Sequence, residues 1–588
     1  AALGVVGAAL AVVAPRRTAP PPAPALGAPR RVTFEAGLEV DPVVSPDGRL
    51  VAYAAGPDDA MRIHVRQLDG GRAIVVSGDL PGPHRRPRWS PDGARLLFQA
   101  GRALWVVPTL GGAARQVVAP PADTMRLAGY ADWSPDGARI AYGVGDTVYV
   151  RDAAGGAPRA VGAAWWPHSL AWSPDGRWIA AVQGNPGFVY GALPWQMGVA
   201  RLGNLAPSSL WLFAADGGAP PRALTDETAL NTSPTWLDAR TLAFVSGRDG
   251  PRDLYTLALD GDGAPAGAPA RLTTALGAHV VAATRGGGTL AFGVLRMRAN
   301  VWALPIGGDG PSTMRDAVQV THGDQTVEGP AVSPDGRTLV YDSDRSGRQD
   351  LWRLRLDAPG AEPEPLVELP GDDFRPSWSA DGRWLAFYTI AGGVRRAAVM
   401  PAEGGAPHLV EPGARVESHS PALSPDGRRL AFYRDVGPRW QLYETERTGD
   451  STWRAARALP GGDGNTPQWS PDGARLAFLR GTEVRVLDPG GAARTVVAPR
   501  DPRLGGALAT YARWLPDGRA LVVSANEASG ATTFWRVPLD GAAPRLLARL
   551  ADARLAPARP EFSTDGRRLF LALAERESDV WTAPLERR

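Results

Sequence analysis

The chain has 588 residues, with 64 basic and 61 acidic side chains and no cysteine. A net charge of +3 spread over this length argues against a nucleic-acid-binding protein, which concentrates positive charge on one face. The lack of cysteine excludes disulfides, thiolate-ligated metals and thiol nucleophiles, while 70 glycines and 56 prolines predict many turns and argue against long helical bundles.

The N-terminal 29 residues divide into two segments. Residues 1–15 are small and apolar, but such a run is shorter than the roughly 20 residues of a membrane span. We expect a truncated transmembrane segment or the apolar core of a signal peptide, with a disordered alanine-rich start as the alternative. Residues 16–29 are rich in proline and predict an extended linker. Membrane contact is expected only through this N-terminal segment.

One turn sequence recurs along the rest of the chain. Ser-Pro-Asp-Gly or a close variant, commonly preceded by tryptophan, occurs ten times, mostly about 45 residues apart. Degenerate copies at Asp238 and at Gly286–Gly288 fill the one long gap, so the chain holds twelve units. The ten turns carry the pairs Asp47 and Gly48, Asp92 and Gly93, Asp136 and Gly137, Asp175 and Gly176, Asp335 and Gly336, Asp381 and Gly382, Asp426 and Gly427, Asp472 and Gly473, Asp517 and Gly518, and Asp565 and Gly566.

Each unit predicts four short strands. Proline presets φ at the second turn position, aspartate bonds to the amides ahead of it, and glycine accepts the left-handed conformation. The flanking runs alternate apolar with polar or small residues, and no segment keeps a helical period. We expect the tryptophans before the turns, such as Trp89 and Trp469, to pack between neighbouring sheets. Four strands in about 45 residues are typical of a β-propeller blade.

The twelve units predict an all-β fold of two tandem six-bladed β-propellers with four-stranded blades, over residues 30–309 and 310–588. In this arrangement Arg30–Glu35 closes the first ring beside the strand at Arg298–Ile306, and Asp316–Thr321 closes the second beside the end of the chain. The alternatives are one larger ring or a split into seven and five blades.

The repeats resemble a known family. WSPDGARLAFLRG (residues 469–481) and VSPDGRTLVYDSDRSGRQDLWRLRLD (residues 332–357) are similar to the TolB-type, WD40-like propeller repeat. The second of these also carries the Ser-Asp-Arg hairpin of that family at Ser343–Arg345, and its aspartate before the third strand at Asp350. The resemblance extends over nearly all of residues 30–588 and implies a fold rather than an activity.

The sequence contains no recognisable catalytic motif. Its seven histidines are scattered, and it holds no Gly-x-Ser-x-Gly elbow, phosphate-binding loop or kinase motif. The regular spacing of the turn aspartates favours a structural role over calcium binding. We therefore expect no enzyme activity, no cofactor and no bound metal.

One insertion interrupts the repeat after Gly176. It is rich in aromatic residues, glycine and proline, as expected of a loop at a propeller face, where binding residues often lie. The candidate binding residues are Phe188, Tyr190, Trp195, Arg201 and Asn204. The alternative is that this loop packs on its own blade or plugs the channel.

The phrase GNLAPSSLW (residues 203–211), the linker and the repeats together resemble the C-terminal propeller region of bacterial membrane-anchored serine/threonine protein kinases. That resemblance implies a non-catalytic extracytoplasmic sensor that binds a protein, a peptide or a small ligand. The alternatives are a free periplasmic TolB-like scaffold protein and a propeller enzyme with an active site in its tunnel.

Overall fold

The computed structural model describes residues 24–586, except 36, 58–59, 120–129, 185–207, 251, 368, 392–393, 414–415, 437–438, 450, 528 and 553–554. The described residues form β-strands joined by turns, with two 3₁₀ turns at Met314–Asp316 and Pro502–Leu504. This confirms the all-β prediction. In the same ranges, no helix has the length and apolarity of a membrane span.

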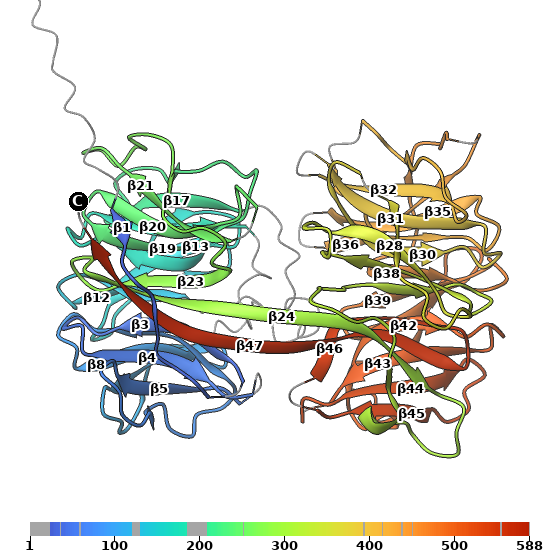
Figure 1. Ribbon diagram of the computed structural model, residues 1–588, viewed down its shortest axis with the longest axis horizontal. Coiled ribbons are helices and arrows are strands. Elements are labelled where there is room, and N and C mark those ends of the chain that lie inside the picture. Colours follow the sequence, from blue (N-terminus) through green and yellow to red (C-terminus); the bar gives the residue numbers. More distant parts are fainter. Residues whose placement is uncertain are drawn as a thin grey trace, which may run out of the picture.

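Ten antiparallel sheets of four strands make up most of the two lobes in Figure 1. In the first lobe they are β3 (Glu39–Val44), β4 (Leu50–Ala55), β5 (Arg62–Gln67) and β6 (Ile74–Val75); β7 (His84–Trp89), β8 (Arg95–Ala100), β9 (Ala103–Pro108) and β10 (Arg115–Val118); β11 (Ala131–Trp133), β12 (Arg139–Val144), β13 (Thr147–Asp152) and β14 (Arg159–Ala163); β15 (His168–Trp172), β16 (Trp178–Gln183), β17 (Ser209–Ala214) and β18 (Arg222–Ala223); and β19 (Asn231–Asp238), β20 (Thr241–Ser246), β21 (Asp253–Ala258) and β22 (Ala270–Arg271). In the second lobe they are β26 (Pro330–Val332), β27 (Thr338–Ser343), β28 (Asp350–Arg355) and β29 (Glu364–Val367); β30 (Asp372–Trp378), β31 (Trp384–Ala391), β32 (Val394–Pro401) and β33 (His408–Leu409); β34 (His419–Leu423), β35 (Arg429–Val436), β36 (Arg439–Glu446) and β37 (Arg457–Ala458); β38 (Asn465–Trp469), β39 (Leu476–Arg480), β40 (Glu483–Leu487) and β41 (Ala493–Val497); and β42 (Leu508–Trp514), β43 (Ala520–Asn526), β44 (Thr532–Pro538) and β45 (Arg545–Leu550).

Two long strands, β24 (Thr289–Pro305) and β47 (Arg568–Glu586), pair antiparallel along their whole length and run from one lobe into the other (Figure 1). In the first lobe they lie between β23 (Ala278–Ala283) and the short strands β1 (Ala25–Leu26) and β2 (Arg30–Arg31). In the second lobe they lie between β46 (Leu555–Thr564) and β25 (Val318–Gln319). The same two strands thus complete a sixth sheet in each lobe.

The sheets of each lobe contact one another in a cycle through their first strands. In the first lobe the order is β3, β7, β11, β15, β19, β23 and back to β3; in the second it is β26, β30, β34, β38, β42, β46 and back to β26. Hydrogen bonds join the last sheet to the first, from Val332 N to Ser563 Oγ at 3.1 Å and from Glu39 N to Ser578 Oγ at 2.7 Å. The first strands therefore surround a central channel in each lobe.

The predicted pairing of Arg30–Glu35 with Arg298–Ile306 is wrong. Arg30 and Arg31 pair with Thr582 and Trp581 of β47, and Val318–Gln319 pairs with β24 instead of the end of the chain. In the four-stranded sheets a turn connects the second strand to the third. Neither β24 nor β47 turns back in this way between the lobes, so each continues as the third strand of the other lobe's sixth sheet. Residues 295–298 (LRMR) and 575–578 (ERES) contain no glycine, proline or asparagine that would form a hairpin turn. The end of β24 therefore lies in the second lobe, and the end of β47 lies in the first.

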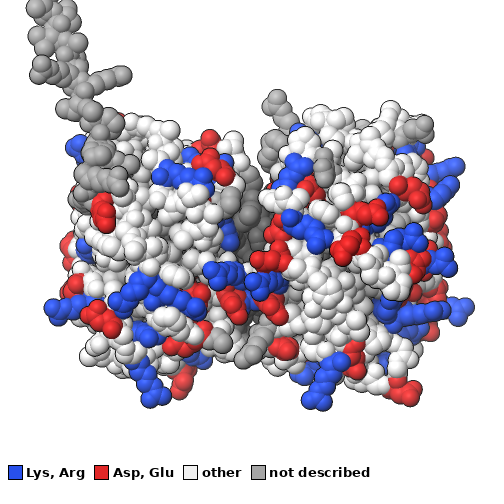
Figure 2. Space-filling model, in the orientation of Figure 1, with Lys and Arg blue, Asp and Glu red and all other residues white. Residues whose placement is uncertain are grey.

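Opposite charges pair where the two strands cross. Arg296 lies opposite Glu577, and Arg298 lies opposite Glu575, so each arginine faces an acidic residue across the ladder. Figure 2 shows basic and acidic side chains side by side on the surface between the lobes. This charge pattern favours the observed pairing of β24 with β47 over one in which the two strands are shifted by a residue.

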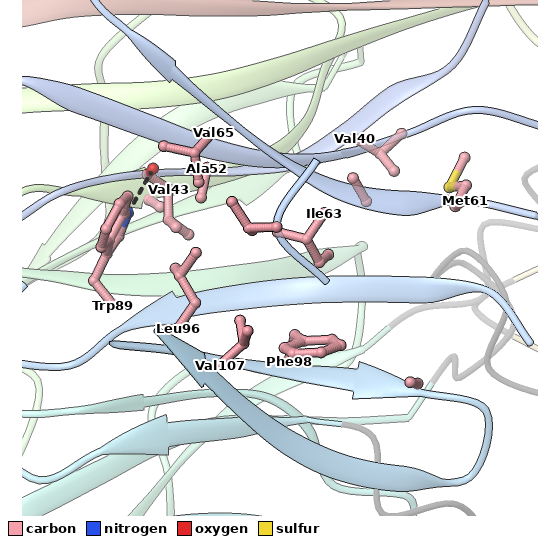
Figure 3. Packing of buried hydrophobic residues seen from close by; sticks show 14 of the residues in the cluster. Val40, Val43, Ala52, Met61, Ile63, Val65, Trp89, Leu96, Phe98 and Val107 are labelled. Atoms are coloured by element: carbon pink, nitrogen blue, oxygen red, sulfur yellow. Dashed lines mark hydrogen bonds between the residues drawn. The ribbon is translucent and has the colours of Figure 1, made fainter. Parts of the chain in front are cut away.

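Apolar side chains fill the space between neighbouring sheets. In the cluster of Figure 3, Val40, Ile63 and Val65 from one sheet pack against Leu96 and Phe98 from the next. Most tryptophans before the turns also form a hydrogen bond to the preceding sheet, as in the 3.1 Å bond from Trp89 Nε1 to the carbonyl oxygen of Val43. The same type of bond is made by Trp133, Trp236, Trp378, Trp469 and Trp514. Trp172 Nε1 instead donates to the carbonyl oxygen of Gly176 in its own turn.

Candidate functional site

The repeated turns connect the first strand of a sheet to the second. In the turn of Asp472, the carboxylate accepts hydrogen bonds from the Ser470 hydroxyl and, at 3.0 Å, from the amide of Ala474, while Gly473 has a φ of 70°. The bond from Ser470 holds the pKa of Asp472 below its usual value. The corresponding serine does the same for Asp47, Asp92, Asp136 and Asp335. These carboxylates are thus bound within their own turns.

The candidate binding residues of the insertion, Phe188, Tyr190, Trp195, Arg201 and Asn204, lie outside the described residues. Across the ranges that the structure covers, no group of three or more histidine, aspartate or glutamate side chains is arranged to hold a metal ion. The first lobe offers a different site.

A cavity of about 340 Å³ lies in the channel of the first lobe. All six sheets contribute to it, each through the end of its first strand or the turn that follows. The walls are polar and apolar in about equal parts, and the apolar part includes Trp89, Trp172 and Trp236, together with prolines of the turns. Because turn residues such as Pro46, Pro135 and Arg285 line it, the cavity opens on the face of the lobe that carries the repeated turns. A volume of about 300–1,000 Å³ is typical of small-ligand sites.

Three charged side chains line this cavity: Arg88, Asp132 and Arg285. Both carboxylate oxygens of Asp132 accept backbone amides, one from Trp133 at 2.9 Å and the other from Trp172 at 2.8 Å. Burial raises the pKa of Asp132, and the nearby charge of Arg88 opposes that shift. Asp132 therefore joins two neighbouring sheets.

The two arginines are bound mainly to backbone carbonyls. Arg88 donates to the carbonyl oxygen of Pro87 at 3.0 Å. Arg285 reaches across the channel mouth from the degenerate turn and donates to the carbonyl oxygens of Pro135 at 2.8 Å and Ser134 at 3.4 Å on the opposite sheet. The cavity thus has two guanidinium groups at its wall and mouth.

The channel of the second lobe is crossed by buried ion pairs. Arg375 on β30 pairs with Glu561 on β46 at 2.7 Å, and Arg559 on β46 pairs with Glu328, which precedes β26. Burial lowers the pKa of the Arg375 guanidinium, but Glu561 and the other acidic groups around it, including Glu328, together outweigh burial and raise that pKa. Burial also raises the pKa of Glu328, an effect that Arg559 counteracts. This channel is therefore occupied by side chains of the protein itself.

These channel residues were not predicted from the sequence. Most first strands carry a β-bulge, with left-handed residues such as Asp41, Arg86 and Arg375 directly before a proline. The available signal was the proline that stands two or three residues before the end of many first strands, as in RPRWS (residues 86–90) and RPSWS (residues 375–379). Proline restricts the preceding residue and cannot extend the ladder, so its recurrence at one strand position indicates a bulge.

Residues 309–497 match the family model of the TolB β-propeller domain, named PD40. The chain is 30% identical over 126 residues to the uncharacterized protein Atu1656 of Agrobacterium fabrum, which covers 20% of this chain and 42% of that protein. It is 40% identical over 67 residues to the uncharacterized peptidase YuxL of Bacillus subtilis, 11% of this chain and 10% of that protein. The chain thus spans less than half the length of either relative.

Among solved structures, TolB from Acinetobacter baumannii is similar with 14% sequence identity and a TM-score of 0.20, over 70% of this chain and 82% of that chain. The family match over residues 309–497, together with the four-stranded sheets and their repeated turns, identifies a TolB-like β-propeller.

Proposed function

We propose that this chain is a non-catalytic recognition module that binds its ligand in the channel of the first lobe. One observation carries the proposal: the first channel holds a cavity whose wall combines tryptophan and proline side chains with three charged groups, whereas buried ion pairs cross the second channel. Loops and channel mouths on a rigid scaffold are common binding sites. In this proposal the first lobe binds the ligand, and the second lobe stabilises the first through the two exchanged strands.

The position of the N-terminal linker supports an extracytoplasmic module tethered to a membrane, as in the sensor region of a membrane-anchored kinase. Ala25 and Leu26 pair with Glu586 and Leu585 of β47. Leu585 N in turn donates to the carbonyl oxygen of Gly288, in the same turn as Arg285. The described chain therefore begins near the face where the cavity opens. An extended proline-rich linker rises about 3 Å per residue, which would hold that face within tens of ångströms of a membrane segment in residues 1–15.

The cavity can be blocked with one substitution. Ala283 lines it and takes the place in its sheet that Trp89, Trp172 and Trp236 take in theirs, so the fold already accommodates an indole at this position. We expect Ala283→Trp to fold normally and to reduce ligand binding at least tenfold.

The test uses the full chain in a screen of small fragments by ligand-observed NMR. Ala543→Trp, at an exposed position of the second lobe, is the matched control and should bind like the unmodified chain. If fragments that bind the unmodified chain bind Ala283→Trp equally well, the cavity is not the binding site and the proposed function is wrong.

A further inference from the structure

The cavity of the first lobe is asymmetric in charge. It is lined by two arginines and one aspartate, and both oxygens of that aspartate already accept backbone amides. No ion pair within 4.0 Å links Asp132 to Arg88 or Arg285 in the described part of the chain. Two positive charges and one negative charge thus line the cavity, and the charges of Asp132 and Asp136 also act on Arg285.

Arg88 is the group that best fits a ligand. Its side chain is half-buried at the cavity wall, and its one hydrogen bond to a described residue runs from Nη1 to the carbonyl oxygen of the adjacent Pro87. The remaining N–H donors of this guanidinium are not matched by an acceptor among the described residues. A guanidinium in such a setting binds a carboxylate through two parallel hydrogen bonds, which are about twice as strong as neutral ones.

Arg285 provides a second donor at the mouth. Among the described residues it donates hydrogen bonds to the carbonyl oxygens of Ser134 and Pro135, which are neutral acceptors that an anionic group can replace. The apolar part of the lining, which includes the edges of the mostly buried Trp89, Trp172 and Trp236, is available to the rest of the ligand. A volume of about 340 Å³ corresponds to a small molecule or to the last one or two residues of a peptide.

We infer that the first-lobe cavity binds a carboxylate carried on an apolar group, with Arg88 as the principal anchor. This inference rests on the proposed function, because it names the ligand chemistry of the same cavity. A free carboxylic acid and the C-terminus of a peptide share this chemistry.

The test compares acids with their neutral amides on the full chain. We expect N-acetylleucine and N-acetyltryptophan to bind the unmodified chain at least tenfold more tightly than N-acetylleucinamide and N-acetyltryptophanamide, measured by saturation-transfer NMR titration. Arg88→Gln should bring acid and amide within twofold of each other. Arg240→Gln, which removes an exposed arginine on the same face outside the cavity, should keep the preference and serves as the matched control.

A longer probe separates the two sources of the carboxylate. If acetyl-Ala-Ala-Leu with a free C-terminus binds at least tenfold more tightly than N-acetylleucine, the site takes a peptide C-terminus; if it binds more weakly, the site takes a small acid. Equal binding of acids and amides that Ala283→Trp abolishes would overturn the carboxylate inference and leave the proposed function in place. Failure of the acids to bind at millimolar concentration, or an acid preference that persists in Arg88→Gln, would also overturn the inference.

Discussion

The glycine that ends the repeated turn has a positive φ, and in several turns it also lies close to the next turn. Gly473 has a φ of 70°, where a residue with a side chain is strained, and a Cβ atom there would lie 3.1 Å from Cδ of Pro425 in the neighbouring turn. The same neighbour relation recurs around the lobes, with Gly566 facing Pro516 and Gly137 facing Pro91. The turn sequence therefore specifies both its own conformation and the contact between neighbouring sheets.

We expect Gly473→Ala to lower the free energy of unfolding by about 1–2 kcal/mol, the cost of the left-handed conformation for an L-residue. Urea unfolding followed by tryptophan fluorescence measures the change. Gly267→Ala is the control, because Gly267 does not have a positive φ and has nothing within 4 Å of the added atom. An equal effect of both substitutions would contradict this account of the turn.

The turns and strands could be predicted from the sequence because they depend on neighbouring residues. Ser470, Pro471, Asp472 and Gly473 contain all the information that their turn needs. The cavity and the ion pairs could not be predicted in this way, since Arg559 and Glu328 are 231 residues apart and meet only when the ring closes.

The strand exchange was missed for a related reason. Two third strands with similar sequences, RANVWALPI (residues 298–306) and ESDVWTAPL (residues 577–585), fit either lobe equally well, and only the absence of a turn between 295 and 298 distinguishes them.

At the scale of elements, charged residues as well as apolar packing join the first strands of the sheets around the channel of the second lobe. Arg559 and Glu328 are 1% and 2% exposed, so neither side chain can regain water if its partner is removed. Asp342 of β27 adds to this network by accepting the amides of Glu328 at 2.7 Å and Arg375 at 2.9 Å. Its burial, together with the charge of Glu328, raises its pKa to about 7.

Removal of one partner should therefore be costly. We expect Glu328→Gln or Arg559→Gln to lower the free energy of unfolding by about 3–5 kcal/mol, the usual result of leaving a buried charge without its partner. Arg298→Ala, which breaks a pair in which both side chains are mostly exposed (58% and 79%), should cost less than about 1 kcal/mol. Calorimetry of the three variants makes the comparison. Buried-pair variants that unfold like Arg298→Ala would show that this pair contributes little to the ring.

At the scale of the whole molecule, β24 and β47 make the lobes dependent on each other. The sixth sheet of each lobe includes a strand segment that continues from the other lobe. The ring that holds the cavity is therefore closed partly by the C-terminal part of β47. The continuous ladder between the lobes also leaves no flexible linker at the crossing. A ligand in the first lobe is thus bound by a scaffold to which both halves of the chain contribute.

The strand exchange can be measured directly because the chain has no cysteine. Arg30 is paired with Thr582 in the observed register, whereas the arrangement without exchange would pair it with the corresponding residue of the other third strand, Ala303. Two double variants, Arg30→Cys with Thr582→Cys and Arg30→Cys with Ala303→Cys, would be oxidised and compared on non-reducing gels. We expect rapid disulfide formation only between positions 30 and 582, since cross-strand neighbours lie within the reach of a disulfide. A disulfide between positions 30 and 303, without one between 30 and 582, would contradict the exchange of strands between the lobes.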